Sequence, residues 1–310
     1  MKIPNSKYQI PNKMIDKERV HKPVLLNEVI KWLDVKKNKN YIDCTIGEGG
    51  HAIEILKRNG PRGKVLGIEI DPELYKKLKE EKLERLVLVN DSFSNLKEIV
   101  KRENFKEVYG ILFDLGISSW HIEKSGRGFS FSRDEPLLMK YSLSSKISAM
   151  EIVNQWPEKE IVKILKEYGE EKFAKRISRQ ICKERKRKKI ETTLQLVEII
   201  KKAVPKWYLH RKIHFATKTF LALRIAVNNE LENLKAGLLQ AIDILERGGR
   251  LVAISFHSLE DKIVKNFLKE KEREGTIKIL TKKPIVPSKG EIKQNPRSRS
   301  AKLRAALKIK

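Results

Sequence analysis

The sequence predicts an α/β protein with a doubly wound, Rossmann-like parallel sheet and a mainly helical inserted subdomain. Short apolar segments alternate with helical segments over the first part of the chain, which is typical of parallel strands joined by crossover helices. A glycine-rich turn follows the first apolar segment and opens a helix, as in folds that bind nucleotide-type cofactors. Over 130 residues then separate Asp114 from the next buried strand at Arg250, far more than one crossover needs.

The other elements follow from local patterns. Residues 1–20 are polar and broken by prolines, so we expect a flexible N-terminal arm. Strands are expected at 41–44, 65–69, 86–89, 110–114, 250–255 and 302–309, and helices at 24–33, 158–168, 171–187, 193–203 and 217–245. The proline-containing residues 270–300 are expected to form a loop. Since the last helix is expected to return to the main domain, the α/β domain comprises 21–135 and 217–310, and the insertion comprises 136–216.

The segment 41–51 gives the clearest indication of a ligand site. An apolar strand runs into Gly47, Gly49 and Gly50, and glycines let the backbone turn tightly and come close to a ligand. Glu69 ends the next strand about 20 residues further on, where a carboxylate can bind ribose hydroxyls. The spacing differs from the pyrophosphate-binding G-x-G-x-x-G, so S-adenosylmethionine, with a ribose and a sulfonium but no phosphate, is favoured over a dinucleotide. The alternative is a glycine turn that closes an ordinary βα unit.

Asp114 is the first candidate for a catalytic group. It ends the fourth predicted strand and precedes a loop of small residues, where ligands of open α/β sheets bind. An exocyclic amine conjugated to its ring is a poor nucleophile, so an oxygen that accepts an amino hydrogen would assist its attack on a sulfonium methyl group. The carboxylate and the neighbouring backbone carbonyl are both candidates; alternatively, Asp114 only caps the following turn. Phe93, after the third strand, is placed either to flank an adenine ring or to join the core.

The charge balance indicates a polyanionic partner. Lys and Arg number 67 against 40 Asp and Glu, a formal net charge of +27. A thermophilic composition alone would raise Glu together with Lys, so nucleic acid is the favoured partner. The two cysteines give no disulfide framework, and the chain shows neither a signal-peptide core nor an apolar run of about 20 residues. A cytoplasmic protein that does not enter a membrane is therefore expected.

Three segments are candidates for RNA contact. Residues 127–131 place two phenylalanines beside an arginine, and these rings can stack an unpaired base or belong to the core. Residues 183–189 hold six cations in seven positions, and 295–304 hold four more among small polar residues. Both can follow a phosphate backbone, although a charge run can also be a solvated face. The candidate residues are Arg127, Phe129, Arg185, Lys186, Arg187, Arg297 and Arg299.

Other chemistries find little support. His210 and His214 have the spacing of a metal pair on a helix, but no nearby acid or cysteine completes a zinc set, so no metal is expected. The sequence shows no Ser-His-Asp arrangement and no phosphate-cradling lysine, which disfavours hydrolysis and nucleotide triphosphate use. A monomer and a homodimer are both compatible with the sequence.

Taken together, these segments resemble the MraW family of bacterial ribosomal RNA small subunit methyltransferases over nearly the whole chain. The resembling segments are 21–26, the glycine loop, 114–119, 127–131, 169–171, 222–228, 255–261 and 295–304. The resemblance implies a class I methyltransferase that uses S-adenosylmethionine to methylate N4 of a decoding-centre, P-site cytidine in 16S ribosomal RNA. It places the cofactor contacts at Gly49, Gly50, His51, Glu69, Phe93, Asp114 and His121.

Several residues depart from the family pattern. Glu69 stands where Asp is usual, and His121 stands where Gln is usual. Two acids and an arginine of the segment P-L-D-M-R-M-D are replaced by Leu138, Lys140 and Ser142. Two further substitutions are Trp120 for Pro and Leu221 for Gln. Two alternatives stay open: an amino methyltransferase that acts on DNA or another RNA, and, because of the altered segment 138–142, a ribosome-associated binding protein that has lost turnover.

Overall fold

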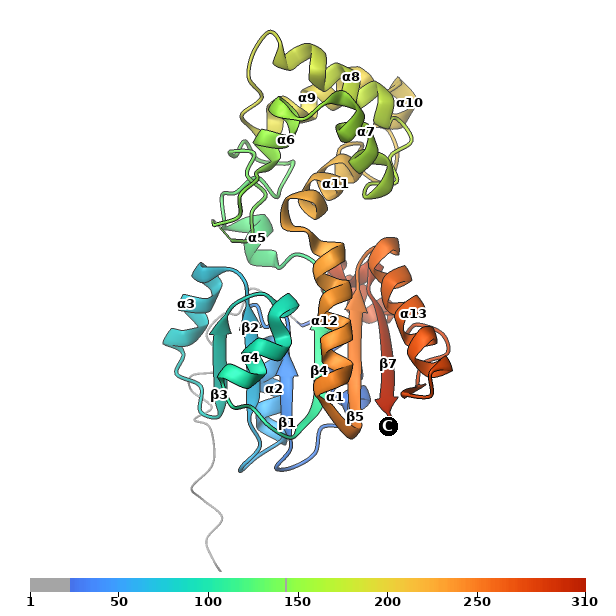
Figure 1. Ribbon diagram of the computed structural model, residues 1–310. Coiled ribbons are helices and arrows are strands. Elements are labelled where there is room, and N and C mark those ends of the chain that lie inside the picture. Colours follow the sequence, from blue (N-terminus) through green and yellow to red (C-terminus); the bar gives the residue numbers. More distant parts are fainter. Residues whose placement is uncertain (1–22, 143) are drawn as a thin grey trace, which may run out of the picture. The chain divides into compact units, whose positions relative to one another are not determined.

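The computed structural model describes residues 23–142 and 144–310, and within them the chain forms two compact units (Figure 1). The first unit runs up to Gly116 and resumes at Leu231–Lys310, and the second is Ile117–Glu230. The predicted arm, 1–20, lies outside the described residues. None of the helices in the described ranges combines the length and the apolar composition needed to cross a bilayer.

The first unit contains a seven-stranded sheet in the order β3-β2-β1-β4-β5-β7-β6. The strands are β1 Asn40–Asp43, β2 Val65–Glu69, β3 Leu86–Asn90, β4 Val108–Asp114, β5 Leu245–Ser255, β6 Ile277–Ile279 and β7 Lys302–Lys308. The first five are mutually parallel, whereas β7 is antiparallel to both of its neighbours. The strand order reverses between β1 and β4, and ligands of open α/β sheets bind beside such a reversal. The Rossmann-like class I fold expected from the sequence is confirmed.

Helices cover both faces of this sheet. The unit contains α1 Leu26–Leu33, α2 Gly50–Arg58, α3 Pro72–Glu80, α4 Leu96–Arg102, α12 Glu230–Ile244, α13 Ser258–Arg273, α14 Lys289–Gln294 and the 3₁₀ turns η2 Phe93–Asn95 and η3 Pro296–Ser300. Consecutive residues of β4 enter opposite apolar clusters, Ile111 and Phe113 with α4, α12 and α13, and Leu112 with α1, α2 and α3. Because both faces are buried, the central strands read as continuous apolar runs, which explains why the sequence revealed them.

The region 270–300 differs from the predicted loop. It contains the end of α13, the edge strand β6 and the short helix α14. Helix α13 starts with a capping box in which the His257 side chain accepts from the backbone N–H of Glu260. Helix α14 is capped by the preceding Ser288, whose side chain accepts from the backbone N–H of Glu291. These local bonds fix the starts of both helices, whereas β6 and α14 are too short to show an apolar period in the sequence.

The predicted helix 217–245 is wrong in its extent, because the structure contains two helices there. Helix α11, Thr217–Asn228, ends at Asn229, which adopts a left-handed φ of 50°, and α12 begins with the next residue. Helix α11 packs against α6, Ala149–Gln155, and α7, Glu158–Glu167, so it belongs to the second unit. Asparagine tolerates this conformation and ends helices where the chain must change direction.

The second unit therefore extends beyond the predicted insertion, 136–216, at both ends. Its other helices are α5 Ser119–Glu123, α8 Ala174–Arg185, α9 Thr193–Ala203 and α10 Lys206–Leu209. At the N-terminal side, the Thr193 hydroxyl accepts from the backbone N–H of Glu135 at 3.1 Å, and the Thr193 N–H donates to the Glu135 carbonyl at 3.0 Å. These bonds tie the segment before residue 136 to helix α9.

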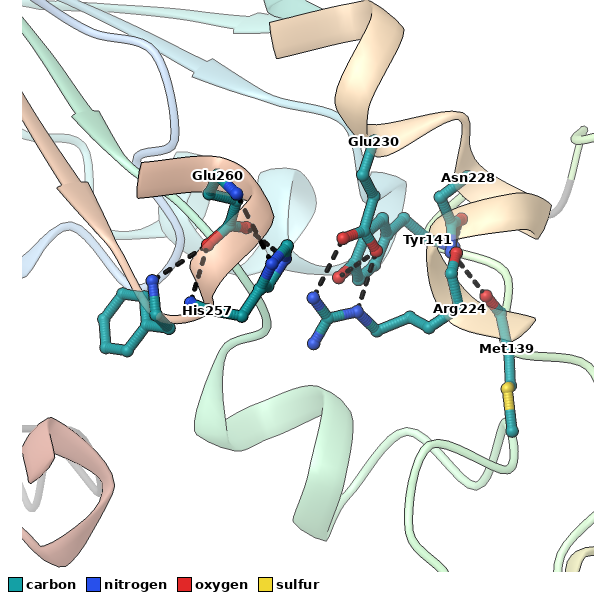
Figure 2. Close-up of polar contacts among 8 residues, drawn as sticks. Met139, Tyr141, Arg224, Asn228, Glu230, His257 and Glu260 are labelled. Atoms are coloured by element: carbon teal, nitrogen blue, oxygen red, sulfur yellow. Dashed lines mark hydrogen bonds and ion pairs between the residues drawn. The ribbon is translucent and has the colours of Figure 1, made fainter. Parts of the chain in front are cut away.

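Asn228 holds a buried turn of the second unit (Figure 2). Its Oδ1 accepts from the backbone N–H of Tyr141 at 2.9 Å, and its Nδ2 donates to the carbonyls of Met139 at 2.7 Å and Arg224 at 2.9 Å. Beside it, Glu230 accepts from Arg224 Nε at 2.8 Å and from the Tyr141 hydroxyl at 3.2 Å. The Asn228 side chain thus supplies hydrogen-bond partners for backbone groups of the turn.

We expect Asn228→Ala to lower the free energy of unfolding by about 2–4 kcal/mol, because it leaves the buried backbone N–H of Tyr141 and the buried carbonyl of Met139 without these hydrogen bonds. Urea unfolding followed by circular dichroism measures the change. Gln155→Ala, at an exposed position of α6, is the matched control and should change the free energy by less than about 0.5 kcal/mol. Equal effects of the two substitutions would show that Asn228 does not hold the turn.

Candidate active site

The loop after β1 forms a cradle at the carboxyl end of the sheet. Gly47 and Gly49 have left-handed φ values of 52° and 80°, and Gly49 directly precedes α2. A Cβ at Gly49 would lie 2.9 Å from Leu78 Cδ1, and one at Gly50 would lie 2.3 Å from Pro23 Cγ. The loop therefore requires glycine for both conformation and space, and its backbone is open to close approach by a ligand.

Glu69, at the end of β2, holds this cradle in place. Its Oε2 accepts from the backbone N–H of Gly47 at 2.9 Å, and its Oε1 accepts from that of Asp71 at 2.8 Å. A carboxylate oxygen has two lone pairs, so each of the two Glu69 oxygens can accept one further hydrogen bond. Burial raises the pKa of Glu69 to about 7. Asp43, at the end of β1, is 1% exposed, and burial likewise raises its pKa to about 7.

Asp114 ends β4 beside the cradle. Its backbone N–H donates to the Thr45 hydroxyl at 2.7 Å, which aligns the two strand ends. One carboxyl oxygen, Oδ2, lies 3.5 Å from His51 Nδ1, whereas Oδ1 is buried and has no hydrogen-bond partner among the described residues. Burial, followed by the charges of Asp43 and Glu260, raises the pKa of Asp114 well above its usual range. An unpaired buried oxygen at a strand end is a site for a ligand's donor or positive charge.

His51 faces Asp114 from the first turn of α2. Its Nε2 lies 3.0 Å from the Val24 carbonyl, which can only accept, so Nε2 carries a proton. The other ring nitrogen, Nδ1, is then directed to Asp114. Asp114 and His51 can therefore share one proton, either as a neutral pair or as an ion pair.

Two further side chains belong to this edge. Phe93, in η2, lies edge-to-face with Phe113 at 5.5 Å between ring centroids and packs closely on Gly237, where a Cβ would lie 2.8 Å from its ring. It therefore joins the core, and its contact with an adenine ring stays a prediction. Glu48 was not among the predicted site residues, yet its Oε2 is buried without a hydrogen-bond partner among the described residues. The only signal in the sequence was its position between two loop glycines.

His121, the seventh predicted cofactor contact, belongs to the second unit. Its Nδ1 lies 2.8 Å from the Ser118 hydroxyl, and its ring contacts those of Phe129 at 5.3 Å and Tyr141 at 5.0 Å. Arg127 is only 4% exposed, and its Nη1 donates to the Tyr141 carbonyl at 2.9 Å. The structure thus places Arg127 and Phe129 in an internal aromatic cluster, where they order the loop, and RNA contact by them stays a prediction.

The chain matches the model of the MraW methylase family over residues 18–309. It belongs to this family. A relative from Persephonella marina, named ribosomal RNA small subunit methyltransferase H, is 47% identical over 293 residues, covering 93% of this chain and 99% of the relative. A relative of the same name from Kosmotoga olearia is 45% identical over 295 residues, covering 93% and 97%. Among solved structures, an rRNA methylase from Streptococcus thermophilus is 12% identical, with a TM-score of 0.42 over 94% of this chain and 100% of that one.

The basic run of this MraW methylase divides into one anchored cation and several exposed ones. Arg185 Nη1 donates to the carbonyls of Val153 at 3.0 Å and Trp156 at 2.7 Å, so Arg185 joins α8 to the end of α6. Lys186 and Arg187 are exposed, as are the two lysines that follow them. In the first unit, the other candidates, Arg297 and Arg299, are exposed on η3. A charge pattern alone does not reveal which cation of a run is used inside the fold.

Proposed function

We propose that this MraW methylase transfers the methyl group of S-adenosylmethionine to the exocyclic N4 of a decoding-centre, P-site cytidine in 16S ribosomal RNA of the small subunit, in the cytoplasm. The observation that carries the proposal is the unpaired, buried Oδ1 of Asp114 beside a glycine cradle. The family and the names of the relatives support methylation of small-subunit ribosomal RNA as the activity.

The residues of the cradle fit this cofactor by their chemistry. Asp43, Glu48 and Glu69 surround the loop with carboxyl groups, which suit a positively charged donor with ribose hydroxyls and would repel a pyrophosphate. Bound there, S-adenosylmethionine supplies a methyl group activated by its sulfonium. The residues proposed to hold it are Gly49, Gly50, His51, Glu69, Phe93, Asp114 and His121.

In this mechanism Asp114 accepts a hydrogen bond from the amino group that is to be methylated. Burial raises the pKa of the Asp114 carboxyl, and a positive charge close to it opposes this shift, so a filled site favours the ionised carboxylate, which accepts a hydrogen bond. The proton that N4 loses on methylation would be taken by the Asp114 carboxylate and can pass on to His51 Nδ1, 3.5 Å away. His51 would hold that proton while its Nε2 keeps its bond to the Val24 carbonyl.

The activity is tested with small subunits from cells that lack this methylase, with labelled S-adenosylmethionine as donor. Mass spectrometry of the digested RNA should find N4-methylcytidine at one decoding-centre position. Free duplex DNA and protein-free ribosomal RNA serve as competing substrates. Incorporation into DNA but not into subunits would favour an amino methyltransferase with another substrate, and tight donor binding without any product would favour a binding protein.

RNA contact by the exposed part of the basic run is tested by Lys186→Gln, Arg187→Gln and Lys188→Gln combined. We expect weaker binding to small subunits and a shallower salt dependence, because each lost phosphate contact reduces the slope of log K against log salt by about 0.7–0.9. Arg185 is left in place because it anchors α8. The matched control removes the same charge from α3 through Lys76→Gln, Lys77→Gln and Lys79→Gln, which are exposed in the first unit. If both triple variants weaken binding equally, net charge and not this run is responsible.

A further inference from the structure

The second unit carries a cluster of three aromatic rings, one of them exposed, that the proposed mechanism does not use. It is formed by Phe173, just before α8, and by Trp207 and Tyr208 in α10. The ring centroids of Phe173 lie 4.9 Å from Tyr208 and 5.9 Å from Trp207, and all three pairs meet edge-to-face. Tyr208 is buried, whereas Trp207 is 57% exposed. Tryptophan carries a large flat apolar ring with one polar end, and such side chains are enriched at binding surfaces.

A buried carboxylate makes the base of this cluster rigid. The Tyr208 hydroxyl donates to Glu171 Oε2 at 2.8 Å, and Glu171 Oε1 accepts from the backbone N–H of Phe173 at 2.8 Å. Glu171 is 3% exposed, so these bonds are shielded from water. Trp207 is therefore presented on a fixed support and is not the tip of a loose loop, which lowers the entropy that a ligand would lose on binding.

Two arginines lie over the rings that support Trp207. The Arg176 guanidinium lies 5.7 Å from the Phe173 ring centroid, and that of Arg211 lies 5.0 Å from the Tyr208 ring centroid. Other exposed cations in the same segments are Lys172, Lys175, Lys206 and Lys212. Of the two acids that precede Phe173, Glu170 is exposed and Glu171 is buried and engaged. The surface thus combines one flat apolar ring with an excess of positive charge.

We propose that Trp207 stacks an unpaired nucleobase of the RNA substrate while Arg176 and Arg211 contact the adjoining phosphates. An aromatic face flanked by arginines is the usual way in which proteins hold single-stranded RNA without reading its sequence. A protein partner would need acidic groups to match the cations, together with a wider apolar area than this single ring offers. The inference rests on the proposed function only in taking RNA as the ligand.

Trp207→Ala in the full chain tests the stacking. Fluorescence anisotropy with a fluorescein-labelled oligouridylate of ten nucleotides should show a loss of affinity of roughly 5- to 100-fold, in the range found for single base-stacking aromatics. Trp207→Phe should retain most of the affinity because it keeps a π-face. The control is Leu194→Ala, which removes another exposed apolar side chain from the same unit and should leave the affinity unchanged.

Two further readouts separate stacking from charge. Trp207 is the only exposed residue among the four tryptophans, so oligouridylate should quench the intrinsic fluorescence of the parent protein and not that of Trp207→Ala. Trp207→Ala should leave the salt slope unchanged, whereas Arg176→Gln and Arg211→Gln should each reduce it by about 0.7. A duplex RNA of equal length should bind the parent and Trp207→Ala equally, because its bases are not available for stacking.

Unchanged oligouridylate affinity and quenching in Trp207→Ala would overturn the inference, and the proposed function would still stand if that variant methylates small subunits. Loss of concentration-dependent self-association in Trp207→Ala, with RNA affinity unchanged, would assign the ring to a second copy of the chain and would also overturn it. Conversely, a parent protein that binds oligouridylate through Trp207 but methylates no subunit would support the inference and contradict the proposed function.

Discussion

Asp114→Asn is expected to reduce the rate of methyl transfer by about 10²- to 10⁴-fold, the range typical of a positioned acid–base group. The amide keeps the size of the side chain and can still accept a hydrogen bond, but it carries no negative charge and takes no proton. Because Asp114 Oδ1 has no partner in the described residues, the substitution breaks no existing bond of that oxygen. The loss should therefore appear in single-turnover rates and not in stability.

Asp114→Ala should reduce the rate at least as much while leaving RNA binding nearly unchanged, since the candidate RNA-binding residues lie elsewhere in the chain. Asp243→Asn is the control, because that exposed carboxylate pairs only with Lys97 at 2.5 Å among the ion pairs of the described residues. Single-turnover assays with labelled donor and small subunits give the rates. If both Asp114 variants keep turnover within about threefold, the carboxylate is not the acceptor, and the backbone carbonyl at this strand end becomes the leading candidate.

The sequence could predict the position of Asp114 but not the surroundings that raise the pKa of its carboxyl. The position of an acid at the end of an apolar strand was visible in the sequence. The proximity of Asp43 and Glu260, which raise the pKa, depends on how β1 and α13 meet β4. Similarly, the pairing with His51 follows from the parallel alignment of β1 and β4, which no local pattern reports.

The sheet was predictable because its strands are buried on both faces, and the glycine loop because it requires residues without a Cβ. The break at Asn229 was not, because the residues on both sides keep a helical spacing and the left-handed backbone of Asn229 is visible only in the structure. The edge strand β6 has three residues, too few to show a period. Arg185 looked like its neighbours, and only its bonds to two carbonyls at the end of α6 distinguish it.

Glu69→Gln is expected to lower the affinity for S-adenosylmethionine by roughly 10- to 100-fold, although the side chain keeps its shape. Both carboxylate oxygens of Glu69 accept from backbone N–H groups, of Gly47 and of Asp71. A glutamine must direct its NH₂ group at one of these donors, which leaves a buried N–H unsatisfied and displaces the cradle.

Glu69→Asp keeps the charge and should retain more affinity, and Glu80→Gln at an exposed position of α3 is the control. Isothermal titration calorimetry measures all four proteins, and equal affinity of Glu69→Gln and the parent would exclude this role.

The pH dependence gives the same carboxyl groups a second, independent test. Burial raises the pKa values of Glu69 and Asp43 to about 7 in the folded protein, from their ordinary values of 4.5 and 3.8. Between these values the folded state holds protons that the unfolded state has released, so the free energy of unfolding without ligand should fall as the pH rises from about 4 to 7. Binding of the positively charged donor should follow the opposite trend and tighten from pH 6 to 8, because it favours the ionised carboxylates. S-adenosylhomocysteine lacks the sulfonium charge and should show a shallower rise, and a donor affinity that is independent of pH would exclude these carboxyl groups from the site.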